Sequence, residues 1–167
     1  TIKRKKHYNW NLFLFQKHIQ FVKVCFHGKK YIAIPYEQPF FSFDDWFIGT
    51  TDMNKGVPQE IQSLTLKFHY NDIESLNELF LKYPEQIAGV ILEPATTLSP
   101  CDKSCNDKVA CNTCPSNKNN FLHQVQSSCK NNGAVFILDE MITGFRWHLQ
   151  GAQTYFDIEP DLSTFGK

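Results

Sequence analysis

The chain has 167 residues, of which 42% are hydrophobic and 14% aromatic, a composition typical of a globular protein and not of a disordered segment. Its 17 basic and 17 acidic residues balance, and this neutral charge argues against nucleic-acid and membrane partners. No apolar run is long enough for a membrane span or a signal segment, so we expect a cytoplasmic location.

The N-terminal part of the chain contains few structural signals. Residues 21–26 are a candidate strand that leads into His27 and Gly28. The aromatic stretch at 39–43 shows no clear period, so we assign it no element. The pattern becomes regular only from about Leu64 onward.

One strand–helix–strand unit is predicted in the middle of the chain. Hydrophobic and polar side chains alternate over 64–70, which is the period of a half-buried strand. Asn71 is the expected N-cap of the following helix, with Glu74 in capping-box position, and Pro84 ends that helix. The short apolar run at 88–92 then predicts a strand buried on both faces.

A second helix and strand follow a polar, cysteine-rich loop at about 96–120. Apolar positions mark a helix from Phe121 to Cys129, and the Asn-Asn-Gly sequence at 131–133 provides its stop. The apolar run at 134–138 is typical of another buried strand. This alternation predicts an α/β fold with a mostly parallel sheet flanked by helices.

Acidic residues follow both buried strands, Glu93 the first and Asp139 the second. Ligands bind beyond the carboxyl ends of strands in open parallel sheets, although acids there also serve as turn and cap residues. Asp139 and Glu140 also fit a Walker B segment, in which the Asp organises Mg²⁺ and the Glu activates water. The chain lacks the phosphate-binding loop G-x-x-x-x-G-K-[ST], so an ATPase fragment is the least favoured interpretation.

Pyridoxal 5'-phosphate (PLP) chemistry accounts for more of these residues. This cofactor needs a lysine for a Schiff base and an acid that keeps its pyridine nitrogen protonated. Asp139 is the candidate acid, and Lys167 follows a segment at 161–166 that is a candidate short strand. Gly166 would let the backbone approach the cofactor closely.

Three segments resemble a known family: 138–146 (LDEMITGFR), 151–153 (GAQ) and 160–167 (PDLSTFGK). In order, spacing and flanking residues they resemble class III aminotransferases, and within that group the branch of glutamate-1-semialdehyde 2,1-aminomutase. The resemblance runs over 44–167, where it corresponds to part of the PLP-binding large domain with the cysteine-rich loop as an insertion. Residues 1–43 match poorly and are treated as a separate N-terminal segment.

The N-terminal segment departs from the family pattern. Phe26, His27 and Gly28 resemble a Tyr-His-Gly-type segment whose aromatic ring stacks on the cofactor, but they lie far upstream of its usual place. We interpret 29–43 as an insertion. The chain stops at Lys167, within a core-like segment, so we expect a piece of a longer protein that is inactive on its own.

The resemblance implies an incomplete fold type I PLP enzyme and a role for each matched residue. Asp139 would pair with the pyridine nitrogen, and Met141 would pack on a face of the ring. Lys167 would form the Schiff base and move protons, while Glu93 and Phe26 would lie near the cofactor. The implied reaction moves an amino group between an amino donor and a carbonyl acceptor, or within one molecule, in a homodimer.

The polar loop contains four closely spaced cysteines, which are Cys101, Cys105, Cys111 and Cys114. Four thiolates at such spacing are candidate ligands of a structural Zn²⁺, and free thiols or disulfides are the alternatives. A zinc-stabilised interaction module is therefore a second candidate function. An inactive remnant of the aminotransferase fold is a third. The sequence does not specify a substrate.

Overall fold

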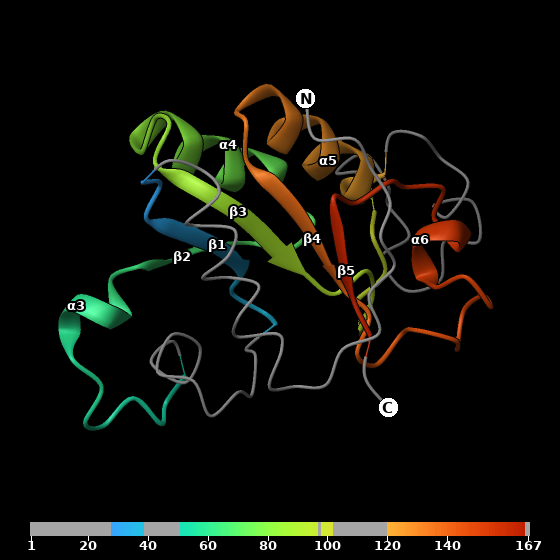
Figure 1. Ribbon diagram of the computed structural model, residues 1–167, viewed down its shortest axis with the longest axis horizontal. Coiled ribbons are helices and arrows are strands. Elements are labelled where there is room, and N and C mark those ends of the chain that lie inside the picture. Colours follow the sequence, from blue (N-terminus) through green and yellow to red (C-terminus); the bar gives the residue numbers. More distant parts are fainter. Residues whose placement is uncertain (1–27, 39–50, 97, 102–119, 166–167) are drawn as a thin grey trace.

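The computed structural model describes residues 28–38, 51–96, 98–101 and 120–165, and every structural statement below concerns these residues. Their strands form one parallel sheet in the order β2-β1-β3-β4-β5 (Figure 1). The strands are β1 (Tyr31–Pro35), β2 (Thr65–Phe68), β3 (Ile87–Leu92), β4 (Val135–Asp139) and β5 (Leu162–Thr164). The predicted α/β class and parallel sheet are confirmed.

Strand β1 was not predicted. It lies between β2 and β3 and is paired with both, with Ile32 opposite Thr65 and Ala33 opposite Val90. Ile32 and Ala33 are fully buried. Residues 31–35 are therefore an internal strand of the sheet, and the interpretation of 29–43 as an insertion outside the fold is wrong for them.

Two longer helices cover one face of the sheet. Helices α4 (Ile73–Lys82) and α5 (Phe121–Asn131) lie side by side above the strands in Figure 1. Their apolar side chains join those of the strands in the main core, since Leu76 of α4 and Leu122 of α5 are fully buried. The remaining helices, α3 (Gln59–Gln62) and α6 (Ala152–Tyr155), are single turns. No helix in these ranges is long and apolar enough to cross a membrane.

The helix ends are only partly as predicted. Asp72, not Asn71, is the N-cap of α4, and its side chain makes no capping hydrogen bond. Asn71 has a positive φ of 63°. Its side chain instead binds the loop after β3, donating to the Ser99 carbonyl and accepting from the Cys101 N–H, both at 2.9 Å. Gly133 has a φ of 61° just after α5, as the predicted left-handed stop requires.

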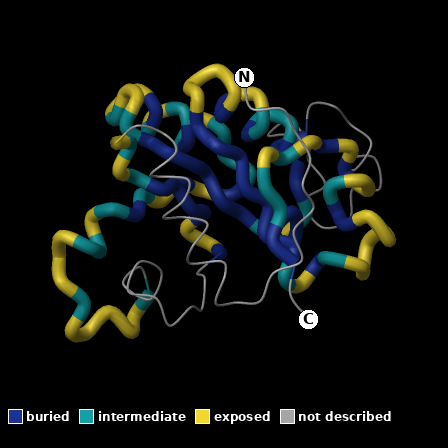
Figure 2. The backbone as a smooth tube through the Cα atoms, in the orientation of Figure 1, coloured by how far each residue is buried: buried dark blue, intermediate teal, exposed yellow. Residues whose placement is uncertain are grey.

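The opposite face of the sheet has a smaller apolar cluster. Its buried members are Ile32, Ile34, Ala88, Ile91, Val135 and Ile137. Figure 2 shows the strands as the buried centre of the molecule, with exposed chain around them. Successive side chains of a strand alternate between faces, so Asp139 lies on the same face as Ile137, at the end of β4.

Candidate functional site

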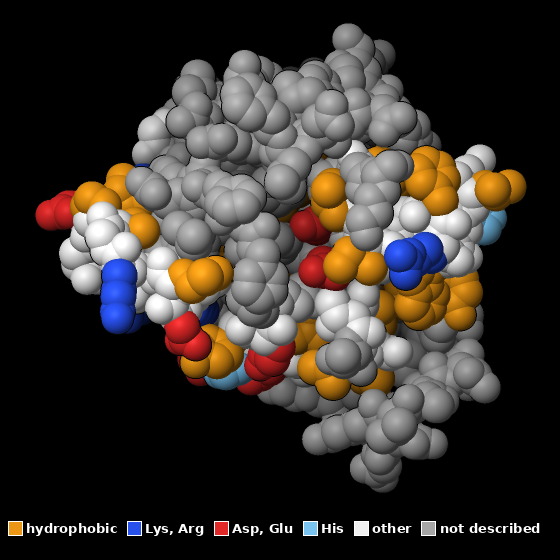
Figure 3. Space-filling model, turned by 90° about the horizontal axis from the view of Figure 1, so that it is seen from below, with side chains coloured by type: hydrophobic (Ala, Val, Ile, Leu, Met, Phe, Trp, Pro, Cys, Tyr) orange, Lys and Arg blue, Asp and Glu red, His pale blue; other side chains and the backbone are white. Residues whose placement is uncertain are grey.

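The carboxyl ends of all five strands lie along one edge of the sheet, because the strands are parallel. Figure 3 views the molecule from below, and acidic side chains lie near the middle of this face with hydrophobic side chains beside them. Leu92 of β3 is opposite Leu138 of β4, so Glu93 and Asp139 follow at neighbouring positions. The sheet register therefore brings the two predicted carboxylates together.

Asp139 is held by two hydrogen bonds to the same oxygen. Its Oδ1 accepts from the Met141 N–H and from the Thr164 hydroxyl, both at 2.9 Å. Its Oδ2 accepts no hydrogen bond from the described residues. The side chain is nearly enclosed, with a relative exposure of 4%. Within the described part of the chain, Asp139 thus has one oxygen fixed by two hydrogen bonds and one oxygen without a donor.

The environment of Asp139 favours a cationic ligand. Burial raises the pKa of its carboxyl, while the hydrogen bonds from Met141 and Thr164 lower it. No Lys, Arg or His of the described ranges forms an ion pair with it. A protonated ring nitrogen would supply both the missing donor and the missing positive charge, so the carboxylate fits such a group.

Glu93 is fixed through its backbone. The buried Gln38 side chain, just beyond β1, accepts from the Glu93 N–H at 2.9 Å and donates to its carbonyl at 3.2 Å. These bonds continue the β1–β3 pairing past the end of β1. The half-buried Glu93 carboxyl has a buried Oε2 without a hydrogen-bond partner. Burial and the neighbouring Asp139 raise its pKa to about 7.

Replacing Glu93 with Gln is expected to stabilise the protein above pH 7 and not at pH 5. Because the folded-state pKa of about 7 exceeds the ordinary value of 4.5, the folded state binds the proton more tightly. Stability contributed by this group is therefore lost as the pH rises from 4.5 through 7. The Gln variant removes that loss, worth about 1–2 kcal/mol for a partly screened group.

Urea unfolding of the full-length protein without cofactor, at pH 5 and pH 8, measures this difference. Glu78→Gln, on the exposed face of α4, is the matched control. An equal pH dependence in the two variants would contradict the assignment.

Glu140 has a structural role that was not predicted from the sequence. It is 1% exposed, and its carboxylate accepts from the Ala152 N–H, through Oε2, and from the Gln153 N–H at 3.2 Å, through Oε1. It therefore caps the first turn of α6 and fixes the loop from 141 to 151. Because both oxygens accept backbone donors, this geometry disfavours the water-activating role that a Walker B interpretation requires.

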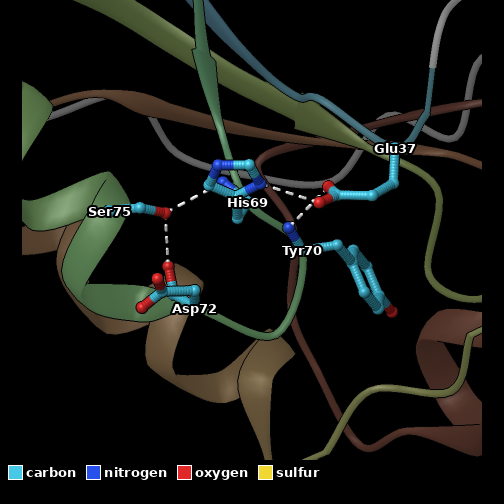
Figure 4. A network of polar contacts seen from close by, with 5 residues as sticks. All are labelled: Glu37, His69, Tyr70, Asp72 and Ser75. Atoms are coloured by element: carbon cyan, nitrogen blue, oxygen red, sulfur yellow. Dashed lines mark hydrogen bonds and ion pairs between the residues drawn. The ribbon is translucent and has the colours of Figure 1, made fainter.

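A polar network lies at the ends of β1 and β2 (Figure 4). Glu37 accepts from the Tyr70 N–H at 2.9 Å and binds His69 Nδ1 at 2.8 Å. Ser75 Oγ accepts from the His69 N–H and donates to the Asp72 carbonyl, which links the network to the start of α4. We assign a structural and not a catalytic role to this network, because its His69 side chain is 61% exposed.

The family model for aminotransferase class III matches residues 3–167. The chain belongs to the class III aminotransferase family. Among curated relatives, the glutamate-1-semialdehyde 2,1-aminomutase 1 of Lachnoclostridium phytofermentans is 42% identical over 112 residues. The glutamate-1-semialdehyde 2,1-aminomutase of Aeropyrum pernix is 40% identical over 116 residues. Each alignment covers 67% of this chain and 23% of the relative, so the chain spans about a quarter of their length.

Solved structures of transaminases share the fold of this class III aminotransferase chain. An omega-transaminase from Sphaerobacter thermophilus has a TM-score of 0.71 at 20% identity. The match covers 95% of this chain and 36% of the omega-transaminase chain. The FumI protein of Sphingopyxis sp. MTA144, in its PLP internal aldimine form, has a TM-score of 0.72 at 21% identity. The match covers 96% of this chain and 35% of the FumI chain. At these identities the likeness shows the fold, which is that of PLP-dependent transaminases.

The predicted site residues of this family member are only partly placed. Asp139, Glu93 and the half-buried Met141 lie at one edge of the sheet. Phe26 and Lys167 lie outside the described residues. Cys101 is buried, and Cys105, Cys111 and Cys114 also lie outside. The described ranges contain no cluster of three or more candidate metal ligands, and zinc remains a prediction.

Proposed function

We propose that this chain is part of the PLP-binding domain of an aminotransferase or aminomutase, with Asp139 facing the pyridine nitrogen and Lys167 bound covalently to the cofactor. The observation that supports this most directly is the Asp139 carboxylate, which is buried at the carboxyl edge of a parallel sheet and whose Oδ2 receives no hydrogen bond from the described residues. The structural neighbour in its PLP internal aldimine form supports this choice of cofactor, and the aminomutase relatives support the class of reaction.

When bound, PLP supplies an electron sink that stabilises negative charge developing next to the amino group. Asp139 would keep a proton on the ring nitrogen through its Oδ2, because its Oδ1 already accepts two hydrogen bonds. Met141 donates its N–H to Oδ1 and so limits rotation of the carboxylate. Lys167 would hold the cofactor covalently, and its amine would be able to move a proton to or from the reacting carbon.

The complete protein is proposed to use a small-molecule amino donor and a carbonyl acceptor, and to function as a cytoplasmic homodimer. The assignment of 44–167 to the PLP-binding domain, with the insertion at about 96–120, is also a proposal, and β1 at 31–35 belongs to the same sheet. The chain alone spans too little of its relatives for us to expect activity from it. Structural zinc held by the cysteine loop would be compatible with this function.

Covalent trapping tests the proposal. The full-length protein is incubated with PLP and reduced with borohydride, and its peptides are then analysed by mass spectrometry. We expect a pyridoxyl group on Lys167 because reduction converts a lysine Schiff base into a stable amine. Lys130 and Lys82, which are the last-turn lysines of α5 and α4, are internal controls that should remain unmodified.

Other outcomes point to the alternatives. A folded protein without any pyridoxyl-lysine would favour the inactive remnant. Stoichiometric zinc that is lost in Cys101→Ser and Cys114→Ser variants, without PLP binding, would favour the interaction module.

A further inference from the structure

The Thr164 side chain makes the one side-chain hydrogen bond that Asp139 receives from the described residues. Thr164 is opposite Asp139 in the β4–β5 pairing, and its carbonyl accepts from the Glu140 N–H at 2.9 Å. Its hydroxyl donates to Asp139 Oδ1 at 2.9 Å in a buried setting. The backbone and side chain of Thr164 therefore both hold the end of β4.

We infer that Thr164 is a positioning residue that orients the Asp139 carboxylate toward the cofactor nitrogen. This inference rests on the proposed function and extends it to the strand that precedes Lys167. The Thr164 hydroxyl and the Met141 N–H together occupy Oδ1 from two sides. These two bonds limit rotation of the carboxylate and leave Oδ2 without a donor among the described residues.

Thr164 contacts Asp139 and is also close in the sequence to the proposed cofactor lysine. It lies in β5, three residues before Lys167 along the chain. Phe165, the next residue, packs against the loop after β4, where its ring centroid is 5.6 Å from that of Phe145. A Cβ on Gly144 would come within 2.7 Å of the Phe165 ring, so only glycine fits there. The segment that precedes Lys167 in the sequence is thus held against the loop after β4.

The Thr164 hydroxyl also supports the ionised form of Asp139. Burial raises the pKa of this carboxyl, and the hydrogen bond from Thr164 opposes that rise. A hydrogen bond to a charged group is among the stronger ones in proteins. Loss of the hydroxyl should therefore both free the carboxylate to rotate and make it easier to protonate.

Thr164→Val and Thr164→Ser in the full-length protein test this inference. Val keeps the branched shape without the hydroxyl, and Ser keeps the hydroxyl without the methyl group. We expect Val to weaken PLP binding about 10- to 100-fold at pH 7 and Ser to stay within about threefold of the wild type. In the protein without cofactor, carbon-13 NMR of labelled Asp side chains should show a higher Asp139 pKa in the Val variant.

Thr65→Val, at another buried strand threonine, is the matched control and should leave both readouts unchanged. Thermal unfolding confirms that each variant is folded. PLP binding that is lost in the Val variant and kept in the Ser variant would show that the hydroxyl, and not side-chain packing, is responsible. Unchanged PLP affinity and unchanged Asp139 pKa in Thr164→Val would overturn the inference while leaving the proposed function intact. A wild-type protein that traps no PLP on Lys167 would overturn both.

Discussion

Replacing Asp139 with Asn is expected to lower amino-group transfer by the full-length protein by about 10²- to 10³-fold. Asn keeps the shape of the side chain and can still accept from Met141 and Thr164 through its carbonyl oxygen. It removes the negative charge that, in the proposed function, would hold a proton on the cofactor nitrogen. Without that proton the ring is a poorer electron sink, so the chemical step should slow more than substrate binding weakens.

The same substitution should not destabilise the protein without cofactor. Burial raises the pKa of the Asp139 carboxyl above its ordinary value, so its ionisation in the folded state costs free energy as the pH rises through that pKa. Asn avoids this cost, and we expect equal or greater stability at pH 8. A loss of activity without a loss of stability is typical of a residue placed for function.

Steady-state kinetics and urea unfolding of the same preparations measure the two effects. Asp157→Asn is the matched control, because Asp157 is exposed and its positive φ of 52° is one that Asn adopts readily. Wild-type kcat in Asp139→Asn would remove Asp139 from the proposed mechanism.

The elements predicted correctly from the sequence are those that a local pattern specifies. The apolar runs at 88–92 and 134–138 became β3 and β4, because strands covered on both faces need no polar side chain in their interior. Helix α5 begins at Phe121 as predicted, where the Asn120 side chain accepts from the His123 N–H. In each case the signal and its physical cause lie within a few neighbouring residues.

The missed elements depend on distant partners. The short apolar run of β1 ends in a proline, which in isolation argues against a central strand. The proline is acceptable here because it is the last residue of the strand. Asn71 fits a capping pattern equally well by sequence, yet its side chain binds the loop at Ser99 and Cys101. Local chemistry does not distinguish these two uses of an asparagine.

The candidate site shows the same division. Glu93 and Asp139 could be proposed from the sequence because an acid after a buried run lies at the carboxyl edge of a parallel sheet. Thr164 and Gln38 were missed because their partners are on other strands, and only the pairing of β4 with β5 and of β1 with β3 brings them together. Glu140 was considered for a catalytic role, but its partners lie in the turn at 152 and 153.

Replacing Gly151 with Ala is expected to destabilise the protein by about 2–6 kcal/mol, which combines backbone strain with overpacking. Gly151 has a φ of 89° and a ψ of 167°, a conformation that glycine alone adopts readily. A Cβ at this position would come within 2.5 Å of the Glu140 carboxylate. That carboxylate cannot move away without losing its hydrogen bonds from the N–H groups of Ala152 and Gln153.

Gly56 provides a matched control that separates the two costs. It has the same φ of 89°, but a Cβ there would meet nothing within 4 Å. Gly56→Ala should therefore cost only the strain, about 1–3 kcal/mol. Urea unfolding of both variants measures the difference in the free energy of unfolding. Equal losses of stability would show that the Glu140 carboxylate does not exclude a Cβ at position 151.

A double-mutant cycle with Glu140→Ala attributes that difference to a contact. Glu140→Ala alone should cost about 2–5 kcal/mol, because it leaves two backbone N–H donors without their acceptor. In the Glu140→Ala background the obstacle to a Cβ at Gly151 is gone, so Gly151→Ala should cost no more than Gly56→Ala does. The coupling free energy would then equal the steric part of the Gly151→Ala loss. Additive losses would instead mean that the Glu140 carboxylate is not the obstacle to a Cβ at Gly151.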